Sequence, residues 1–193
     1  MMTPLGNVAD VSTGYPFRKK VESEEGGDVV LVQLKDIDGA EGVSGSGAIM
    51  LRNDDGRYHR HLLQEGDLLF QSRGSRHPVA VVESGLRGIA AIGLHVVRPH
   101  SGRVLPAYLA WWLNHPASQA KFRDELARGT YIPFVAVADL RAFLVPVPTL
   151  EVQRRIGDLD RLRRRERELT ERLNDLTQQL VDGATLAAAT RMK

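Results

Sequence analysis

Short apolar runs, separated by polar and glycine-containing segments, fill the first 148 residues of the chain. Residues 28–34 (DVVLVQL) form the clearest run, and its β-branched residues are typical of a strand. Asp55-Gly56 is a turn signal. The pattern predicts further strands at residues 48–51, 68–71, 79–83 and 89–97, and loops at residues 39–47, 52–60 and 72–78.

Helical spacing follows these strands. Residues 106–113 place their apolar side chains three and four positions apart, behind a proline in the first turn. Pro116 begins a second helix, which we expect Gly129 to end as a C-cap. Residues 138–143 are predicted to form a helical turn, and residues 144–148 (LVPVP) an extended segment, because proline restricts itself and the residue before it. Residues 1–148 are therefore predicted to be a mixed domain of strands and helices.

Residues 149–193 have a different pattern, that of one long helix. Residues 150–181 contain no proline, and leucines recur at heptad spacing with a single polar interruption at Glu166. We expect Gly183 and the small residues after it to end or fray the helix. The heptad leucines are Leu162, Leu169, Leu173, Leu176 and Leu180.

Such a helix cannot bury its own apolar stripe. At about 1.5 Å per residue, residues 150–181 would span roughly 48 Å. The pattern favours pairing with a helix of a second copy or of another protein. The alternative is that the helix lies along its own domain.

Composition excludes several kinds of chemistry. The chain has 193 residues and no Cys, so disulfides, cysteine-ligated zinc, iron–sulfur clusters and a thiol nucleophile are excluded. The absence of Cys fits a reducing cytoplasm, where we expect the protein. No apolar run approaches about 20 residues, and the N-terminus lacks the pattern of a signal peptide, so no membrane association is expected.

Charge is unevenly distributed although the formal net charge is only +2. Residues 22–41 carry seven carboxylates and one Lys, whereas residues 52–103 carry eight Arg, five carboxylates and five of the six His. A basic region within a nearly neutral domain fits a surface that binds a polyanion. The alternative is a solvated surface with scattered Arg.

Three clusters are candidates for contact with double-stranded DNA. Arg and Gln can form paired hydrogen bonds with guanine and adenine edges, and Ser and His suit phosphate oxygens. For the third cluster, the alternative interpretation is a plain helix end followed by a turn, without a role in binding. The clusters are first Gln71, Arg73, Ser75, Arg76 and His77, second Arg52, Arg57, Tyr58 and His59, and third Thr130 and Tyr131.

Enzymatic sites are not evident in the sequence. His59 and His61 would share a strand face, but no carboxylate stands at a convincing ligand spacing, so no metal is expected. No GxSxG, phosphate-loop or dinucleotide-binding glycine pattern occurs. We therefore expect neither catalysis nor a cofactor.

Several segments together resemble the DNA specificity (S) subunits of type I restriction–modification systems. Residues 145–156 (VPVPTLEVQRRI) are the most specific, because they resemble the junction that leads from a target recognition domain into a long helix. The other similar segments are residues 5–14 (LGNVADVSTG), 32–38 (VQLKDID), 64–70 (QEGDLLF), 108–113 (YLAWWL) and 128–134 (RGTYIPF).

The resemblance implies an α+β fold, with a small curved mixed β-sheet and packed helices followed by a coiled-coil helix. It also implies a non-catalytic function in which the chain recognises DNA sequence and positions an adenine-N6 methyltransferase (M) subunit and, in full systems, a restriction (R) subunit. An S subunit of the usual kind has two recognition domains, whereas this chain has one. The chain is therefore a half-subunit, a truncated form, or a member of a related group that works alone. As a half-subunit, we expect it to form a homodimer that reads a bipartite palindrome. The alternatives are a protein-interaction module without a DNA role, or a decoy that pairs through the same helix.

Overall fold

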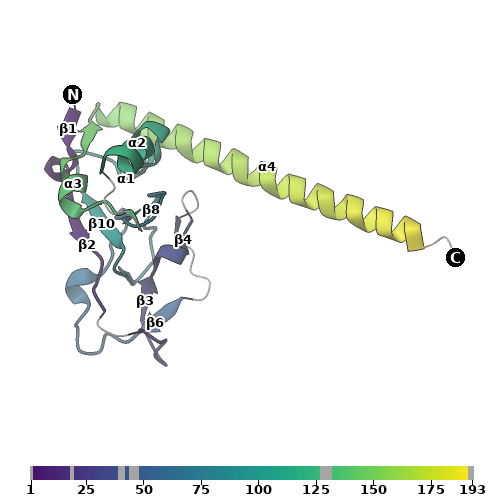
Figure 1. The fold of residues 1–193 in the computed structure, drawn as a ribbon, viewed down its shortest axis with the longest axis horizontal. Coiled ribbons are helices and arrows are strands. Elements are labelled where there is room, and N and C mark those ends of the chain that lie inside the picture. Colours follow the sequence, from purple (N-terminus) through teal and green to yellow (C-terminus); the bar gives the residue numbers. More distant parts are fainter. Residues whose placement is uncertain (1, 18–19, 39–41, 44–47, 127–131, 191–193) are drawn as a thin grey trace. The chain divides into compact units, whose positions relative to one another are not determined.

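The computed structural model describes residues 2–17, 20–38, 42–43, 48–126 and 132–190. It divides the chain into two compact units, residues 1–157 and 158–193. The first unit holds all the strands of the described residues and the shorter helices, and the second holds most of the long helix (Figure 1).

The first unit is built on a four-stranded antiparallel sheet. Its order is β2 (Ala9–Thr13), β10 (Leu94–Pro99), β7 (Leu68–Gln71) and β8 (Val79–Val81). One core fills the space between this sheet and the helices α1 (Pro106–Asn114) and α3 (Val137–Ala142), and it includes Phe122, which directly follows α2 (Pro116–Lys121). Leu109, Leu113 and Phe122 are fully buried there, as the helical spacing predicts.

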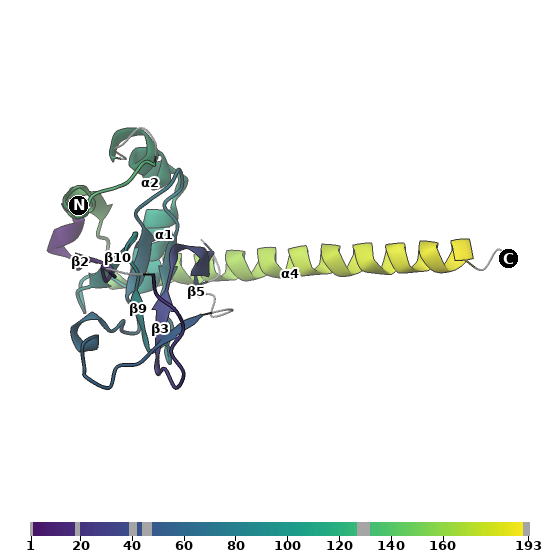
Figure 2. The same cartoon turned by 60° about the horizontal axis from the view of Figure 1, so that its bottom comes forward.

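A second, three-stranded sheet is mixed. Strand β3 (Val29–Val32) pairs antiparallel with β6 (Ile49–Leu51) and parallel with β9 (Gly88–Ala90). In both views α2 and β3 lie toward opposite ends of the first unit (Figure 1, Figure 2). Mixed sheets with packed helices and a long C-terminal helix confirm the predicted α+β class.

Two short strand pairs complete the described sheets. Strand β1 (Met2–Pro4) pairs with β11 (Leu144–Pro146), which confirms the extended conformation predicted from the prolines. Strand β4 (Ile37–Asp38) pairs with β5 (Gly42–Val43). The prediction of a loop at residues 39–47 was therefore wrong at residues 42–43.

The strand predicted at residues 89–97 is in fact two strands of different sheets. Gly93 adopts φ +101°, and the Leu94 N–H donates to the Ala91 carbonyl oxygen across 3.2 Å, which closes a turn between β9 and β10. Positive φ is tolerated by glycine because it has no Cβ. The apolar run concealed this turn, since both flanking segments are buried.

The remaining described connections include short helical turns that the sequence pattern did not reveal. They are 3₁₀ turns at Leu5–Asn7, Leu34–Asp36 and His59–His61. The helix α2 continues into a π-helical segment at Phe122–Leu126. Gly129, the predicted cap of this helix, lies outside the described residues.

The long helix α4 (Leu150–Thr190) begins inside the first unit. The Gln153 side chain is completely buried, and its Oε1 accepts the Leu105 N–H at 2.8 Å. Its Nε2 donates to the Pro148 carbonyl oxygen at 2.9 Å and the Arg103 carbonyl oxygen at 3.1 Å. Gly157 faces Ala107 so closely that an added Cβ would lie 3.1 Å from the Ala107 Cβ. Residues 150–157 are thus packed and hydrogen-bonded within the first unit.

The second unit is a single helix with exposed leucines. The helix continues past Gly183 to Thr190, so the prediction that it ends near Gly183 was wrong. One glycine costs roughly 1 kcal/mol in a helix, and the alanines that follow it favour helix most strongly. None of the described helices is long and apolar enough to cross a membrane.

Candidate nucleic-acid interface

The first candidate cluster lies on the loop at residues 72–78, directly after β7. Both the backbone N–H and the Oγ of Ser72 donate to the Gly93 carbonyl oxygen, at 2.8 and 2.7 Å. The Gly74 N–H donates to the Pro133 carbonyl oxygen at 2.9 Å, and the Gly74 φ of +111° turns the chain. The base of the loop is therefore fixed by two separate segments.

Three polar side chains of this loop are exposed, those of Arg73, Ser75 and Arg76. Gln71 is half-buried, and its Nε2 donates to the Arg73 carbonyl oxygen at 2.9 Å, so it supports the loop backbone. Among the residues that the structure describes, neither Arg73 nor Arg76 has an ion-pair partner. Their charges are thus available to an external anion.

His77 is not at the surface, and its assignment to a DNA contact is corrected. Its side chain is completely buried and stacks on Phe70 with ring centroids 5.6 Å apart. Its Nδ1 lies 2.9 Å from the Gln71 carbonyl oxygen, to which a protonated Nδ1 donates. Burial lowers the pKa of His77, so the neutral ring is favoured. His77 supports the loop from beneath.

Gln119 of α2 holds the same loop from the helical side. Its Nε2 donates to the His77 carbonyl oxygen at 2.8 Å, and its Oε1 accepts the His77 N–H at 3.2 Å. A two-way amide contact of this kind fixes the backbone between Arg76 and Pro78. The exposed cations consequently stand on a constrained loop rather than on a freely moving one.

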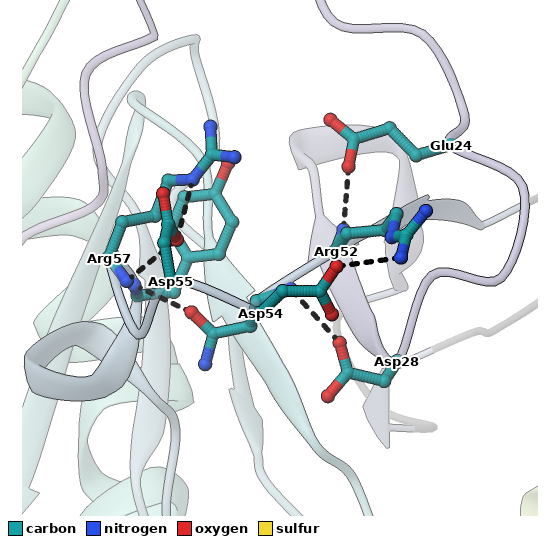
Figure 3. Close-up of polar contacts among 8 residues, drawn as sticks. Glu24, Asp28, Arg52, Asp54, Asp55 and Arg57 are labelled. Atoms are coloured by element: carbon teal, nitrogen blue, oxygen red, sulfur yellow. Dashed lines mark hydrogen bonds and ion pairs between the residues drawn. The ribbon is translucent and has the colours of Figure 1, made fainter.

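The second cluster follows β6, and its cations already have partners (Figure 3). Arg52 Nη2 lies 2.7 Å from Asp54 Oδ2, and Arg57 Nε donates to Asp55 Oδ1 at 3.1 Å. The backbone N–H of Arg57 also donates to Asp55, and these two hydrogen bonds lower the pKa of that carboxyl. Both ion pairs are exposed and therefore contribute little free energy, so a phosphate group can replace either carboxylate at low cost.

Tyr58 is a core residue, and its assignment to a DNA contact is also corrected. Its side chain is only 3% exposed, and its ring meets Tyr15 edge to face with centroids 5.3 Å apart. Burial raises the pKa of Tyr58. The Tyr58 ring belongs to the core cluster of the second sheet, and Tyr15 and Phe17 pack against that cluster. His59, by contrast, is exposed on its 3₁₀ turn.

Thr130 and Tyr131, the third cluster, lie outside the described residues. The segment that follows them, residues 132–135, forms the other side of the first loop. The Val135 N–H donates to the Ser72 carbonyl oxygen at 2.9 Å, and Arg73 and Phe134 form an antiparallel bridge.

The first and second clusters are held at different ends of the first unit. Gln119 of α2 holds the first loop, whereas Tyr58 of the second packs into the core of β3. In both views these two elements lie toward opposite ends (Figure 1, Figure 2).

Sequence reasoning missed Phe134 and Ile132, which are 43% and 54% exposed. Large exposed apolar side chains beside a cationic loop are informative, because such side chains are usually buried. The resemblance includes Phe134, but no local signal shows that Phe134 pairs with Arg73, which lies some 60 residues earlier in the chain.

No metal site is evident within the described ranges, since they contain no group of three or more His, Asp or Glu side chains arranged to hold an ion. A small pocket of about 110 Å³ is lined by Asp10, Ser12, Tyr15, Arg60, His61 and Arg98, among others. This volume is below the roughly 300–1,000 Å³ of pockets that hold organic ligands.

Comparisons with known proteins agree on one family. A family model described as "Type I restriction modification DNA specificity domain" matches residues 1–178. No curated protein matches the chain.

Solved structures give the same fold. A chain from a structure described as the basis of complex assembly and conformational transition of the type I R-M system has a TM-score of 0.69 and 19% identity, over 92% of this chain and 41% of that one. The HsdS subunit from Thermoanaerobacter tengcongensis has a TM-score of 0.57 and 19% identity, over 86% and 38%. A type I restriction-modification S subunit from M. genitalium has a TM-score of 0.57 and 13% identity, over 82% and 37%. This chain therefore spans about two fifths of the length of these solved chains.

Proposed function

Because the chain belongs to the type I restriction modification DNA specificity domain family, whose role is DNA sequence recognition, we propose that it selects the site at which an adenine-N6 methyltransferase acts. The chain itself contributes recognition and no catalysis. The M subunit, and in a full system the R subunit, would supply the chemistry.

The observation that carries this proposal is the constrained loop at residues 72–78. It presents Arg73 and Arg76 without ion-pair partners among the described residues, and Ser75 is exposed beside them. Unpaired Arg side chains on a constrained backbone suit paired hydrogen bonds to a base edge, because no ion pair has to be broken and the loop backbone is already held. The side-chain amide of Gln71 supports the loop backbone and lies at the edge of the proposed contact surface.

The second and third clusters have supporting roles in the proposal. Arg52, Arg57 and His59 are exposed, and the ion pairs of the two Arg would be exchanged for phosphate contacts that orient the duplex. Thr130 and Tyr131 immediately precede the segment that pairs with the first loop, so we include them in the interface.

We further propose that two copies pair through α4. The exposed fraction of the heptad leucines ranges from 49% for Leu176 to 73% for Leu180. An exposed heptad stripe is stabilised by a partner helix. A symmetric dimer of this chain would present two identical recognition domains and select a bipartite palindrome. The M subunit would dock on the same helical region.

The test is a methylation assay with a randomised duplex pool. The M subunit is incubated with the pool, with and without the full chain, and N6-methyladenine is mapped by sequencing. The proposal predicts methylation within one bipartite palindrome and only when the chain is present. Methylation of an asymmetric motif would remove the symmetric dimer from the proposal, and methylation that does not depend on the chain would overturn it.

A further inference from the structure

The hydrogen bonds between the first loop and residues 132–135 determine which side chains are neighbours. Gly74 N–H donates to the Pro133 carbonyl oxygen, and Val135 N–H to the Ser72 carbonyl oxygen, both at 2.9 Å. These bonds flank the bridge between Arg73 and Phe134, which makes that bridge a non-hydrogen-bonded antiparallel pair. In such a pair the two Cα atoms are about 4.5 Å apart and the side chains leave on the same face.

The burial of the neighbouring residues identifies that face as the outer one. Side chains alternate between the two faces of a strand, so Ser72 and Val135 point opposite to the bridged pair. Ser72 is 4% exposed and Val135 is fully buried, whereas Phe134 is 43% exposed and Arg73 is exposed. The ladder thus has an inner face in the core and an outer face that carries one cation and one aromatic ring.

The backbone on both sides of Phe134 is fixed. Pro133 restricts its own φ and accepts the Gly74 hydrogen bond. The Val135 carbonyl oxygen lies 2.8 Å from Nε2 of the buried His95, and a protonated Nε2 donates to it. An exposed aromatic ring on a fixed backbone cannot turn into the core, which already contains the neighbouring Val135.

We propose that Arg73 and Phe134 read neighbouring base pairs in the major groove, with Phe134 contacting the 5-methyl group of a thymine. This inference rests on the proposed DNA recognition. A spacing of about 4.5 Å between their Cα atoms is close to the 3.4 Å rise of one base step. Arg pairs with guanine N7 and O6, and an aromatic side chain is a favourable contact for the thymine methyl. The DNA site that the chain selects should therefore contain a base pair with guanine next to a base pair with thymine.

The experiment removes single methyl groups from the DNA. The full chain is used to select its site from randomised duplexes, and each thymine of that site is replaced in turn by deoxyuridine, which lacks only the methyl group. Burial of one methyl group is worth about 0.8 kcal/mol, so replacing the contacted thymine should raise the Kd about fourfold. Phe134→Ala should bind the thymine and deoxyuridine duplexes equally, and Phe134→Leu should restore part of the difference.

Two controls separate this reading from a general loss of binding. Leu144→Ala removes an apolar side chain of similar exposure, 46%, from β11, and should keep the fourfold difference. Replacing the neighbouring guanine by 7-deazaguanine should weaken binding by the wild-type chain but not by Arg73→Ala.

The outcomes distinguish the inference from the function on which it rests. Selective binding that is insensitive to every thymine methyl, or a methyl effect that persists in Phe134→Ala, overturns the inference and leaves sequence recognition intact. A wild-type chain that selects no sequence, alone or with the M subunit, overturns both.

Discussion

Arg98 holds the buried carboxylate of Asp67 through two parallel hydrogen bonds. Arg98 Nε donates to Asp67 Oδ1 and Nη2 to Oδ2, both at 2.7 Å, and the Asp67 side chain is only 1% exposed. The Gln64 N–H also donates to Asp67 at 2.8 Å, so this ion pair joins the start of β7 to β10. The hydrogen bond to Asp67 raises the pKa of Arg98.

Arg98→Ala should therefore destabilise the first unit. Among the described residues, the substitution leaves the buried carboxylate with one hydrogen-bond donor, which costs about 2–3 kcal/mol after allowance for the partly exposed Arg98. Urea unfolding followed by tryptophan fluorescence measures the loss. Arg87→Ala is the matched control, because its partner Asp28 is about half exposed and 3.0 Å away, and it should cost less than about 1 kcal/mol. Equal losses in the two variants would contradict this account.

Acid should weaken the first unit through His77 and His95. Both rings pack parallel to Phe70, and burial lowers the pKa of each below the ordinary value of 6.5. The folded state keeps the rings neutral while the unfolded chain takes up protons, so their contribution is complete above pH 6.5 and decreases as pH falls toward the folded pKa values.

The pH dependence can be measured from urea midpoints at pH 7.5 and 5.5. The wild-type chain should lose stability at the lower pH, and the double variant His77→Gln, His95→Gln should lose less between the two values. His59→Gln, at an exposed position, should retain the wild-type dependence. An unchanged dependence in the double variant would show that other groups are responsible.

Substitution of the exposed loop cations should change DNA binding in a diagnostic way. If Arg73 reads a base, Arg73→Ala should cost about 1–3 kcal/mol and relax selection at one position, whereas a phosphate contact would give a uniform loss on all sequences. Binding to the selected duplex and to variants of each base pair distinguishes the two. Arg155→Ala, an exposed cation paired with Glu151 at 2.6 Å on α4, is the control and should leave the selected sequence unchanged.

Charged residues on the heptad stripe should separate the proposed dimer. Leu169 and Leu173 are 50% and 64% exposed, and a partner helix would bury them. The double variant Leu169→Glu, Leu173→Glu should be monomeric by light scattering, with residues 1–148 still folded. Leu186→Glu lies off the heptad spacing and should remain dimeric. A dimer that survives the double variant would exclude this stripe as the interface.

The sequence predicted the elements whose signals are local. The helix predicted at 106–113 corresponds to Pro106–Asn114, because proline at its start and apolar spacing are properties of the segment itself. The family resemblance was also confirmed. By contrast, the division of residues 89–97 between two sheets depends on the turn at Gly93 and on distant strand partners, which no local pattern contains.

Burial explains what the sequence could not show about the candidate site. Tyr58 and His77 are polar aromatics in polar segments, yet both fill cores because neighbouring residues supply a hydrogen-bond acceptor or an aromatic contact. Phe134 was missed for the opposite reason, since an apolar residue in an apolar segment is ordinarily expected inside. Phe134 is exposed because side chains alternate between the two faces of the ladder that it forms with residues 72–74, and only the fold brings these two segments together.

The most direct test of the central claim is selection of DNA by the purified full chain from a randomised duplex pool, with and without the M subunit, followed by sequencing of the retained duplexes. DNA recognition by a symmetric dimer predicts enrichment of one bipartite palindrome, and loss of that enrichment in the double variant Arg73→Ala, Arg76→Ala. A chain that forms a dimer but enriches no sequence under either condition would contradict DNA recognition and favour a protein-interaction module.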